Sequence, residues 1–512
     1  MSRFIPLFIF AVWMAAPSPV LPPAPPALTP LCIFLGFYGA LILVLRFISQ
    51  RTAANVHYGS ADKRLRRFNL LMFSSKVIVP TWFGVGIYLL GWRNDVTWLL
   101  TRTRIGSWPI ESPELLLASL PPFLALAGLW WAQFPADRAL REQNLLVQLN
   151  EDLPIHAPPS FATYLRVNLR LQILFVIAPT LALVLLRDGL SLVIPPLLNH
   201  ITFLRERQNL VELLLSLPSF ILLLTVGPEL LRRVLHTQRL PDGPLRDRLI
   251  AICTSRGVGF RNILLWQTDH QMSNAAVMGF IPRFRYLLLS DLLLETMNDR
   301  QIEAIFAHEV GHIYHRHLWW MILSIAALLL ALVGPGQLAI DGLDAIQRHM
   351  WMPDTLQLAI LSVSAIAVFA AIFGYLSRKF ERQADLFAVR TMSSAAELPV
   401  LAGAALDDPS IRSRFTLPAE TPEEGELADG AAVFCSALQR VALVNNISVA
   451  ARSWTHGSIS SRMEFVFSLP DNPCRVSHFD RFMRWLYTGL VVALFGMAAW
   501  AFPLLLSTTP LQ

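Results

Sequence analysis

The sequence predicts a mainly α-helical protein that crosses a membrane several times. Of its 512 residues, 54% are hydrophobic and only 15% are charged, whereas soluble proteins contain about 25% charged residues. A water-soluble chain of this composition could not cover its apolar side chains with polar surface. The apolar residues also gather in runs of about 20, the length of a helix that crosses the hydrocarbon of a bilayer.

Cysteine usage and charge exclude several other classes. The four cysteines are scattered and form no C-x-x-C pair, so neither a disulfide framework nor a cysteine zinc site is expected. The net charge of +6 comes from 42 Lys+Arg against 36 Asp+Glu, and most basic residues flank apolar segments. We interpret this charge as topology information and expect a lipid bilayer, but no nucleic acid, as a partner.

Apolar runs of spanning length occur in both halves of the chain. Together with the N-terminus, which is either a signal peptide or an anchor at residues 1–16, they give about 7–9 spanning segments. Prolines inside some runs are compatible with helices in lipid. The predicted spans are 31–48, 69–92, 115–134, 171–186, 210–231, 318–340, 356–376 and 486–506.

Basic residues after the first span, such as Arg51 and Lys63, predict that this loop is cytoplasmic. Strict alternation of the spans then places the two long polar segments on the same side, and they share one side under either orientation. They can therefore build one site together. The predicted domains are a membrane region with about five spans, a first polar segment, two spans, a second polar segment, and a last span with its tail: 1–231, 232–317, 318–376, 377–484 and 485–512.

The first polar segment contains His308-Glu309-Val310-Gly311-His312. Positions i and i+4 share one face of a helix, so His308 and His312 can bind one zinc ion while Glu309 reaches the attacking water. Asn298 or Asp299 is expected to cap this helix at its start.

A catalytic zinc ion usually has a third protein ligand. His315 and His317 follow the motif at the wrong phase, and we interpret them as basic residues at the membrane boundary. Glu381 and Asp385, after two further spans, again stand at i and i+4. One carboxylate could bind zinc while the other holds a ligand imidazole, although a solvated charge cluster is the alternative.

In their order, these motifs resemble the integral-membrane zinc metallopeptidases that include the type 1 CAAX prenyl proteases and the bacterial heat-shock membrane protease. The resemblance implies one Zn²⁺ per chain, held by His308, His312 and Glu381. Asp385 is expected to support a ligand imidazole without binding the ion itself. The resemblance also implies a gluzincin-type metalloprotease domain with a small β-sheet. The motifs that carry it are 273–279, 286–293, 308–312, 380–385 and 455–458, followed by Arg462.

The same resemblance implies roles around the zinc ion. Glu309 would be the general base, and His456 and Arg462 would help to stabilise the oxyanion. Asn274, Ala275 and Gly279 would bind substrate, which could pair with their strand edge by strand addition. Gly457 departs from the pattern, because the family usually has Pro there, and a more mobile loop is expected.

The predicted function is zinc-dependent endopeptidase activity on peptides or membrane-protein segments, in membrane-protein quality control. Only three of the 42 basic residues are Lys, a bias that is consistent with a GC-rich bacterial genome, so we expect an inner-membrane protein whose catalytic domain faces the cytoplasm. CAAX-type processing of lipidated peptides is the alternative within the family.

Two other classes remain open. Site-2 intramembrane proteases also use H-E-x-x-H, and residues 341–344 superficially resemble their downstream L-D-G motif, but Arg300, Glu303 and Arg316 flank the histidines here. A zinc-binding transporter or scaffold without catalysis would have no need of a base beside its ligands. Glu309 argues against that interpretation.

Overall fold

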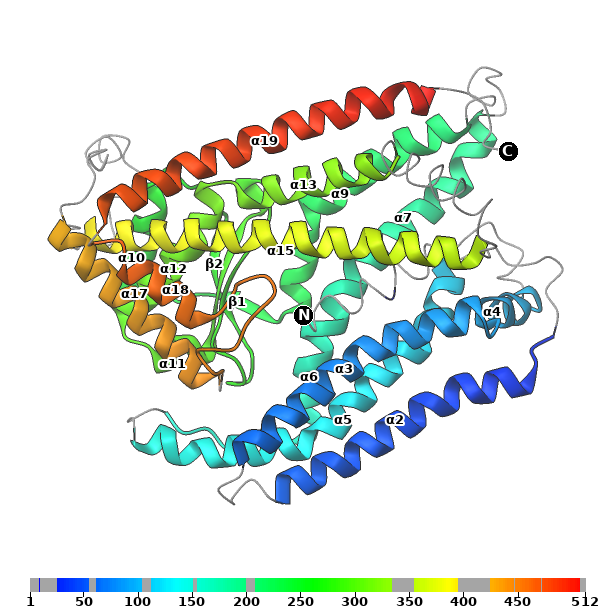
Figure 1. Ribbon diagram of the computed structural model, residues 1–512, viewed down its shortest axis with the longest axis horizontal. Coiled ribbons are helices and arrows are strands. Elements are labelled where there is room, and N and C mark those ends of the chain that lie inside the picture. The colour runs from blue at the N-terminus through cyan, green and yellow to red at the C-terminus, as the bar shows by residue number, and fades with distance from the viewer. Residues whose placement is uncertain are drawn as a thin grey trace. The chain divides into compact units, whose positions relative to one another are not determined.

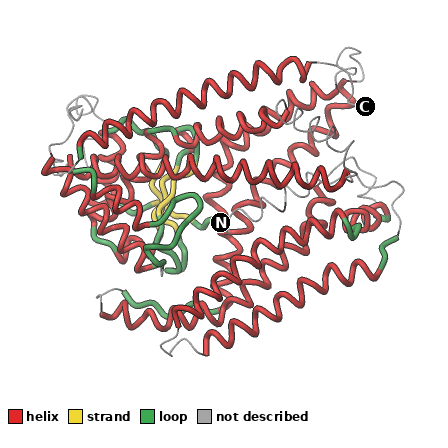
Figure 2. Tube along the Cα trace, viewed as in Figure 1, coloured by secondary structure: helices red, strands yellow, loops and turns green. Residues whose placement is uncertain are grey.

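The computed structural model describes residues 9, 25–54, 61–103, 112–150, 154–198, 208–333, 354–394, 424–445, 447–470 and 472–506. Figure 2 shows that this part of the chain is mostly helical, with strands confined to one small sheet. The predicted fold class is therefore confirmed. The expected signal peptide or anchor lies, apart from residue 9, outside the described residues.

The chain forms two compact units. The first comprises Met1–Arg239, Leu264–Ser273 and Phe284–Thr296, and the second comprises Leu240–Ile263, Asn274–Arg283 and Met297–Gln512. Both units therefore contain part of the segment predicted as 232–317, whose domain boundaries stay a prediction.

Three long helices pack side by side in the first unit, as Figure 1 shows: α2 (Leu28–Ala54), α3 (Ala61–Tyr88) and α5 (Ser112–Asn150). Glycine allows close contact between two of them. A Cβ atom on Gly128 of α5 would lie 2.4 Å from the side chain of Ile42 on α2. The inner faces bury large side chains, whereas Leu43 and Leu70 are more than half exposed, as expected for helices that face lipid.

The remaining helices of the first unit, except the short α11 of the polar segment, continue the predicted membrane region. Helices α3, α5 and α9 run on through internal prolines, as lipid-embedded helices can when neighbouring groups satisfy the freed carbonyls. Their bounds are α4 (Trp92–Thr101), α6 (Phe161–Asn168), a π-helical turn (Leu169–Leu174), α7 (Phe175–Leu198), α9 (Gln208–Val234) and α11 (Asp291–Thr296).

Six helical segments among the described residues are long and apolar enough to cross a membrane. Five of them coincide with predicted spans. The sixth, Leu427–Val444, lies in the second polar segment, where no span was predicted; 44% of it is buried inside the protein. Predicted spans 210–231 and 356–376 lie on the helices Gln208–Val234 and Asp354–Ser394, and 318–340 is described as helix only as far as Val333. The candidates are Leu28–Ala54, Leu70–Tyr88, Ser112–Gln143, Phe161–Leu190, Leu427–Val444 and Cys474–Trp500.

A four-stranded sheet has the order β1-β2-β4-β3. Strands β1 and β2 are antiparallel, with Thr237 opposite Trp266. Every residue of β4 is buried, as in a strand covered on both faces. The order leaves β3 at one edge, where the sequence placed the substrate-binding edge. The strands are β1 (Thr237–Arg239), β2 (Asn262–Trp266), β3 (Ala275–Met278) and β4 (Tyr286–Ser290).

The second unit gathers helices around the one that carries the two histidines, α12 (Asp299–Tyr314), which contacts α15 and α17. Figure 1 shows α13, α15 and α19 running beside one another. The other helices of this unit are α10 (Pro244–Ser255), α13 (His317–Val333), α15 (Asp354–Ser394), α17 (Glu424–Val444), α18 (Ile459–Phe467) and α19 (Pro473–Leu506).

Close contact between α12 and α15 depends on Gly311. A Cβ atom at this position would lie 3.2 Å from the backbone Cα of Ala384 and 3.1 Å from the Phe387 side chain. Ala384 is itself fully buried. Small residues on both helices therefore let the two backbones approach, and Glu381 on α15 is thereby held beside the histidines of α12.

Replacing Gly311 by Val should force these helices apart. Overpacking a close helix contact costs about 1–3 kcal/mol, so the free energy of unfolding should fall by that amount in a denaturant titration. The control is Gly189→Val on α7, where a new Cβ meets nothing within 4 Å. Equal effects of the two substitutions would contradict the special role of Gly311.

Candidate active site

Helix α12 begins with a complete capping box. The Gln301 backbone N–H donates to the Asn298 side chain over 2.9 Å, and the Asn298 N–H donates to the Gln301 side chain over 3.3 Å. Asn298 is thus the cap, which decides between the two predicted residues. One turn further, buried Glu303 pairs with Arg248 of α10 at 2.5 Å. These contacts fix the helix that presents His308, Glu309 and His312.

The three predicted zinc ligands come together. The Nε2 atoms of His308 and His312 are 3.3 Å apart, and the Glu381 carboxylate oxygens lie 3.5 Å from His308 Nε2 and 3.6 Å from His312 Nε2. In a tetrahedral zinc site, ligand bonds of about 2.0–2.1 Å place neighbouring ligand atoms about 3.3–3.5 Å apart. The triad therefore has the spacing of a zinc site.

The donor set also fits a cation. Glu381 is buried, and its Oε2 atom accepts no hydrogen bond from a described residue. Burial by itself raises the pKa of this carboxyl group, but the neighbouring His308 and His456 hold it well below its ordinary value. An ionised, buried carboxylate oxygen without a hydrogen bond, beside two imidazoles, is the arrangement that a divalent ion would complete.

Asp385 fixes the orientation of His308. Its Oδ1 atom lies 3.0 Å from His308 Nδ1, so that Nδ1–H donates to it and the Nε2 lone pair faces the site. Arg462 in turn donates to both oxygens of Asp385, over 3.0 Å from Nε and 2.5 Å from Nη2. The alternative of a solvated charge cluster is wrong, because Asp385 is 0% exposed.

Glu309 lies next to the ligands on α12 and is half-buried. Burial raises the pKa of its carboxyl group to about 7, against the opposing effect of the nearby cationic groups. A carboxylate with this pKa exchanges protons readily near neutral pH. Position and pKa both suit a general base.

His456 and Arg462 reach the same site from the last polar stretch. His456 is 60% exposed, and its Nδ1 atom lies 2.8 Å from Glu381 Oε1. Arg462 Nη1 lies 3.6 Å from Glu381 Oε2. Both residues therefore contact the ligand carboxylate, while their expected action on an oxyanion stays a prediction. Asn274 and Gly279 flank β3, and Ala275 begins it; their substrate-binding role also stays a prediction.

The loop before α18 explains why Gly457 departs from the family pattern. Its φ is +75°, which proline cannot adopt because its ring holds φ near about −65°. Its N–H donates to the Ser453 carbonyl over 3.0 Å, and the Ser453 N–H donates back over 2.9 Å. This small hairpin carries His456.

His317 is a site residue that the sequence did not reveal. It is only 3% exposed, so its interpretation as a basic residue at the membrane boundary is wrong. Its Nε2 atom lies 2.9 Å from Gln383 Oε1, and its Nδ1 atom lies 2.9 Å from His312 Nδ1. Because Gln383 Oε1 can only accept, His317 carries its proton on Nε2 and accepts from His312 Nδ1–H. The His312 Nε2 lone pair is thereby directed to the ligand site.

Sequence spacing could not find this chain of hydrogen bonds, because His317 follows a turn at Arg316, whose φ is +56°. The turn breaks the helical phase on which the prediction relied. Phe434 of α17 was also missed, because its segment has no motif. Its ring stacks on that of His308, with the centroids 5.8 Å apart. A second His/Glu cluster also appears in the first unit, at His156, His270 and Glu295.

Removing the His317 imidazole should weaken zinc binding. Loss of the hydrogen-bond partner of a metal-bound histidine typically costs 10- to 100-fold in affinity, so His317→Ala should weaken binding by about that factor. Competition with a chromophoric chelator measures the change. His478→Ala, an exposed histidine on α19, is the control and should leave affinity unchanged; an unchanged affinity in His317→Ala would remove His317 from the site.

Proline at position 457 should open the hairpin. Gly457→Pro removes both the required φ and the N–H donor, so the amides of Ser453 and His456, which are hydrogen-bonded in this hairpin, should lose protection against hydrogen exchange. Gly457→Ala keeps the N–H donor but strains the backbone by about 1–2 kcal/mol. The hairpin amides of this variant should therefore lose less protection than those of the proline variant. If the proline variant exchanged like the native chain, the two backbone bonds would not hold this loop.

The chain is similar to known proteins over the segment that carries this site. Residues 250–482 match the model of Peptidase family M48. CAAX prenyl protease 1 homologs are 27% identical over 208 residues in Arabidopsis thaliana and 26% identical over 156 residues in Oryza sativa subsp. japonica. These matches cover 38% and 29% of this chain, and 49% and 37% of the relatives, so about half or less of each relative is spanned.

Among solved structures, S. mikatae Ste24p is similar with a TM-score of 0.46 and 14% identity, over 86% of this chain and 100% of that chain. The family match and the curated relatives confirm the resemblance that the order of the motifs predicted: the chain is similar to the M48 peptidases over residues 250–482 and to the CAAX prenyl protease 1 homologs.

Proposed function

We propose that this protein is a zinc-dependent endopeptidase that cleaves peptides or membrane-protein segments at a membrane. The observation that carries the proposal is the site on α12 and α15. His308, His312 and Glu381 have zinc-like spacing, and Glu309 stands next to them. A purely structural zinc site, as in a transporter or scaffold, requires no such carboxylate.

In this proposal, each residue of the site has a separate role. When bound, zinc would supply a Lewis acid that polarises the scissile carbonyl and acidifies water. Glu309 takes the proton of the attacking water and delivers it to the leaving amine. Asp385 and His317 hold the two imidazoles in the tautomers that ligands require. Arg462 keeps Asp385 ionised: burial raises the pKa of that carboxyl group, but the guanidinium lowers it below its usual value.

Arg462 and His456 are proposed to act near the developing oxyanion. Both contact Glu381, and His456 is exposed enough to meet a substrate. Because Arg462 already donates to both Asp385 oxygens, we assign it first a positioning role on the ligand histidine.

An extended substrate pairing with the edge strand β3, near Asn274, Ala275 and Gly279, would present one peptide bond to the site.

Replacing Glu309 by Gln tests the mechanism. The variant should bind zinc with native stoichiometry yet lose peptidase activity by about 10²–10⁴-fold, the usual contribution of a general base. Zinc content and cleavage of a quenched fluorescent peptide measure the two effects. Full activity with zinc bound would exclude Glu309 as the base, and a native zinc content without any cleavage in the wild type would favour the scaffold.

Two substrate classes compete. Membrane-protein quality control follows from the few lysines, which suggested a bacterial source in which prenylated proteins are not expected. The curated relatives are named CAAX prenyl protease 1 homologs, which is compatible with lipidated peptides as substrates. Cleavage of a farnesylated CAAX peptide, compared with the same peptide without the lipid and with a misfolded membrane segment, separates them. Glu309→Gln is the matched control for contaminating proteases.

We further propose that the protein resides in a bacterial inner membrane with its catalytic site facing the cytoplasm. Basic residues after the first span support this orientation. A site-2 type of protease is disfavoured, because charged Arg300 and Glu303 precede the histidines on α12. Residues 341–344, the other element of that alternative, lie outside the described residues.

A further inference from the structure

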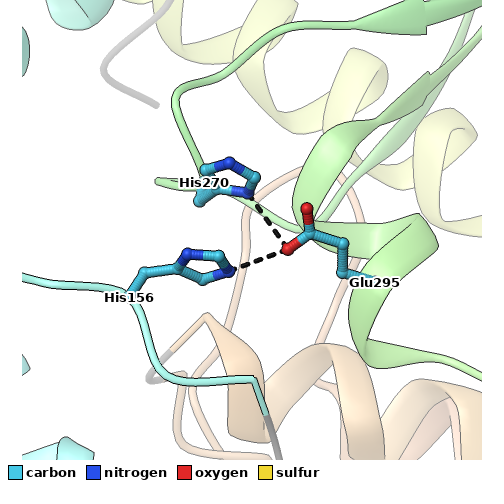
Figure 3. A group of neighbouring side chains, drawn as sticks. All are labelled: His156, His270 and Glu295. Carbon is cyan, nitrogen blue, oxygen red and sulfur yellow. Dashed lines mark hydrogen bonds and ion pairs between the residues drawn. The ribbon is translucent and has the colours of Figure 1, made fainter.

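A second group of metal-binding side chains lies in the first unit, and Figure 3 shows its three members facing one another. His156 Nε2 lies 2.7 Å and His270 Nδ1 lies 3.2 Å from the same atom, Glu295 Oε2. The three side chains are between 35% and 39% exposed. Two imidazole nitrogens thus face one carboxylate oxygen.

The turn that carries His270 is held in an unusual conformation. Asp269 and His270 both have positive φ, at 52° and 53°, a costly conformation for residues other than glycine. Asp291, the first residue of α11, stabilises this turn. Its carboxylate accepts hydrogen bonds from the backbone N–H groups of Thr268 over 2.9 Å and His270 over 3.2 Å. Glu295 is one helical turn further along the same helix. One element therefore fixes both the backbone of His270 and the carboxylate that it faces.

His156 comes from a different part of the chain. It lies between α5 and α6 in a stretch with Pro154, Pro158 and Pro159, whose restricted φ angles reduce the freedom of the segment. Alternation of the predicted spans puts this loop on the same side of the membrane as the polar segment 232–317. The topology is consistent with a site built from both.

His270 Nδ1 is buried and lies 3.2 Å from Glu295 Oε2, yet the two atoms do not have the geometry of a hydrogen bond. The same carboxylate oxygen forms a hydrogen bond with His156 Nε2 over 2.7 Å. A divalent cation could bind all three atoms at once, with open positions left for water.

We propose that His156, His270 and Glu295 form a second cation site of the Zn²⁺ class, distinct from the site on α12 and additional to the single zinc predicted per chain. The two imidazoles stack at 4.0 Å with an interplanar angle of 10°, so shared coordination requires one ring to turn about its Cβ–Cγ bond. Their exposure leaves room for that rotation. The bound ion would join the loop after α5 to α11, which immediately precedes the helix of the catalytic motif.

The test counts cations in the full-length protein in detergent. A His308→Ala/His312→Ala background removes two ligands of the first site, so that any remaining specific site is the second. Titration of this protein with Co²⁺, followed by its visible d–d absorption, and with Zn²⁺ by equilibrium dialysis should give one equivalent per chain. The thermal midpoint should rise when either ion is added.

Variants of the cluster should abolish this binding. His156→Ala, His270→Asn and Glu295→Gln should each weaken the second equivalent at least 10-fold; Asn is chosen because it tolerates the positive φ, and Gln because it keeps the shape of Glu. His236→Asn, an exposed histidine that also has positive φ, is the matched control and should bind one equivalent. Absence of a bound equivalent in the double-Ala background, or binding that survives all three cluster variants, overturns the proposal.

The same variants separate this proposal from the proposed function. In an otherwise native chain they should keep the first zinc equivalent, and peptide cleavage should depend on Glu309 as before. Loss of the second equivalent with cleavage retained supports two independent sites. A wild-type chain that holds only one equivalent refutes the second site and leaves the peptidase proposal standing.

Discussion

The close approach of α12 and α15 is the constraint on which the site depends. Gly311 and Ala384 leave just enough space for the two backbones, and this contact brings Glu381 within 3.6 Å of both histidines. The interval between the sequence motifs contains two predicted spans, so in the predicted topology the chain crosses the membrane twice between His312 and Glu381. Helix packing, rather than local sequence, completes the triad.

Around this contact, each ligand is oriented by a partner of different chemistry. His308 donates to the ionised carboxylate Asp385, which Arg462 neutralises, whereas His312 donates to a neutral imidazole, His317, backed by the amide of Gln383. One ligand is thus supported by charge and the other by a neutral chain of hydrogen bonds. The asymmetry limits the net charge that must be buried beside Glu381.

Much of this arrangement could be predicted from the sequence. The apolar runs predict spans because period and length are local properties, and His308, His312, Glu381 and Asp385 carry the i, i+4 spacing of a helix face. His317 could not be predicted, because a turn of positive φ at Arg316 resets the helical phase. The span candidate at 427–444 was missed because α17 combines the apolar length of a span with a face that packs on the catalytic helices. The cluster of His156, His270 and Glu295 has no sequence motif, because His156 lies more than a hundred positions before the other two residues.

Helix α15 is continuous over 41 residues, from Asp354 to Ser394, and includes both the predicted span at 356–376 and the ligand Glu381. With a rise of about 1.5 Å per residue, the ligand lies only about 7–8 Å beyond the end of that span. Because the helix is continuous, a tilt of the span also displaces the residues beyond its end. In the predicted topology, a change in bilayer thickness that tilts the span would therefore move the carboxylate relative to the histidines of α12 and couple the lipid environment to the geometry of the site.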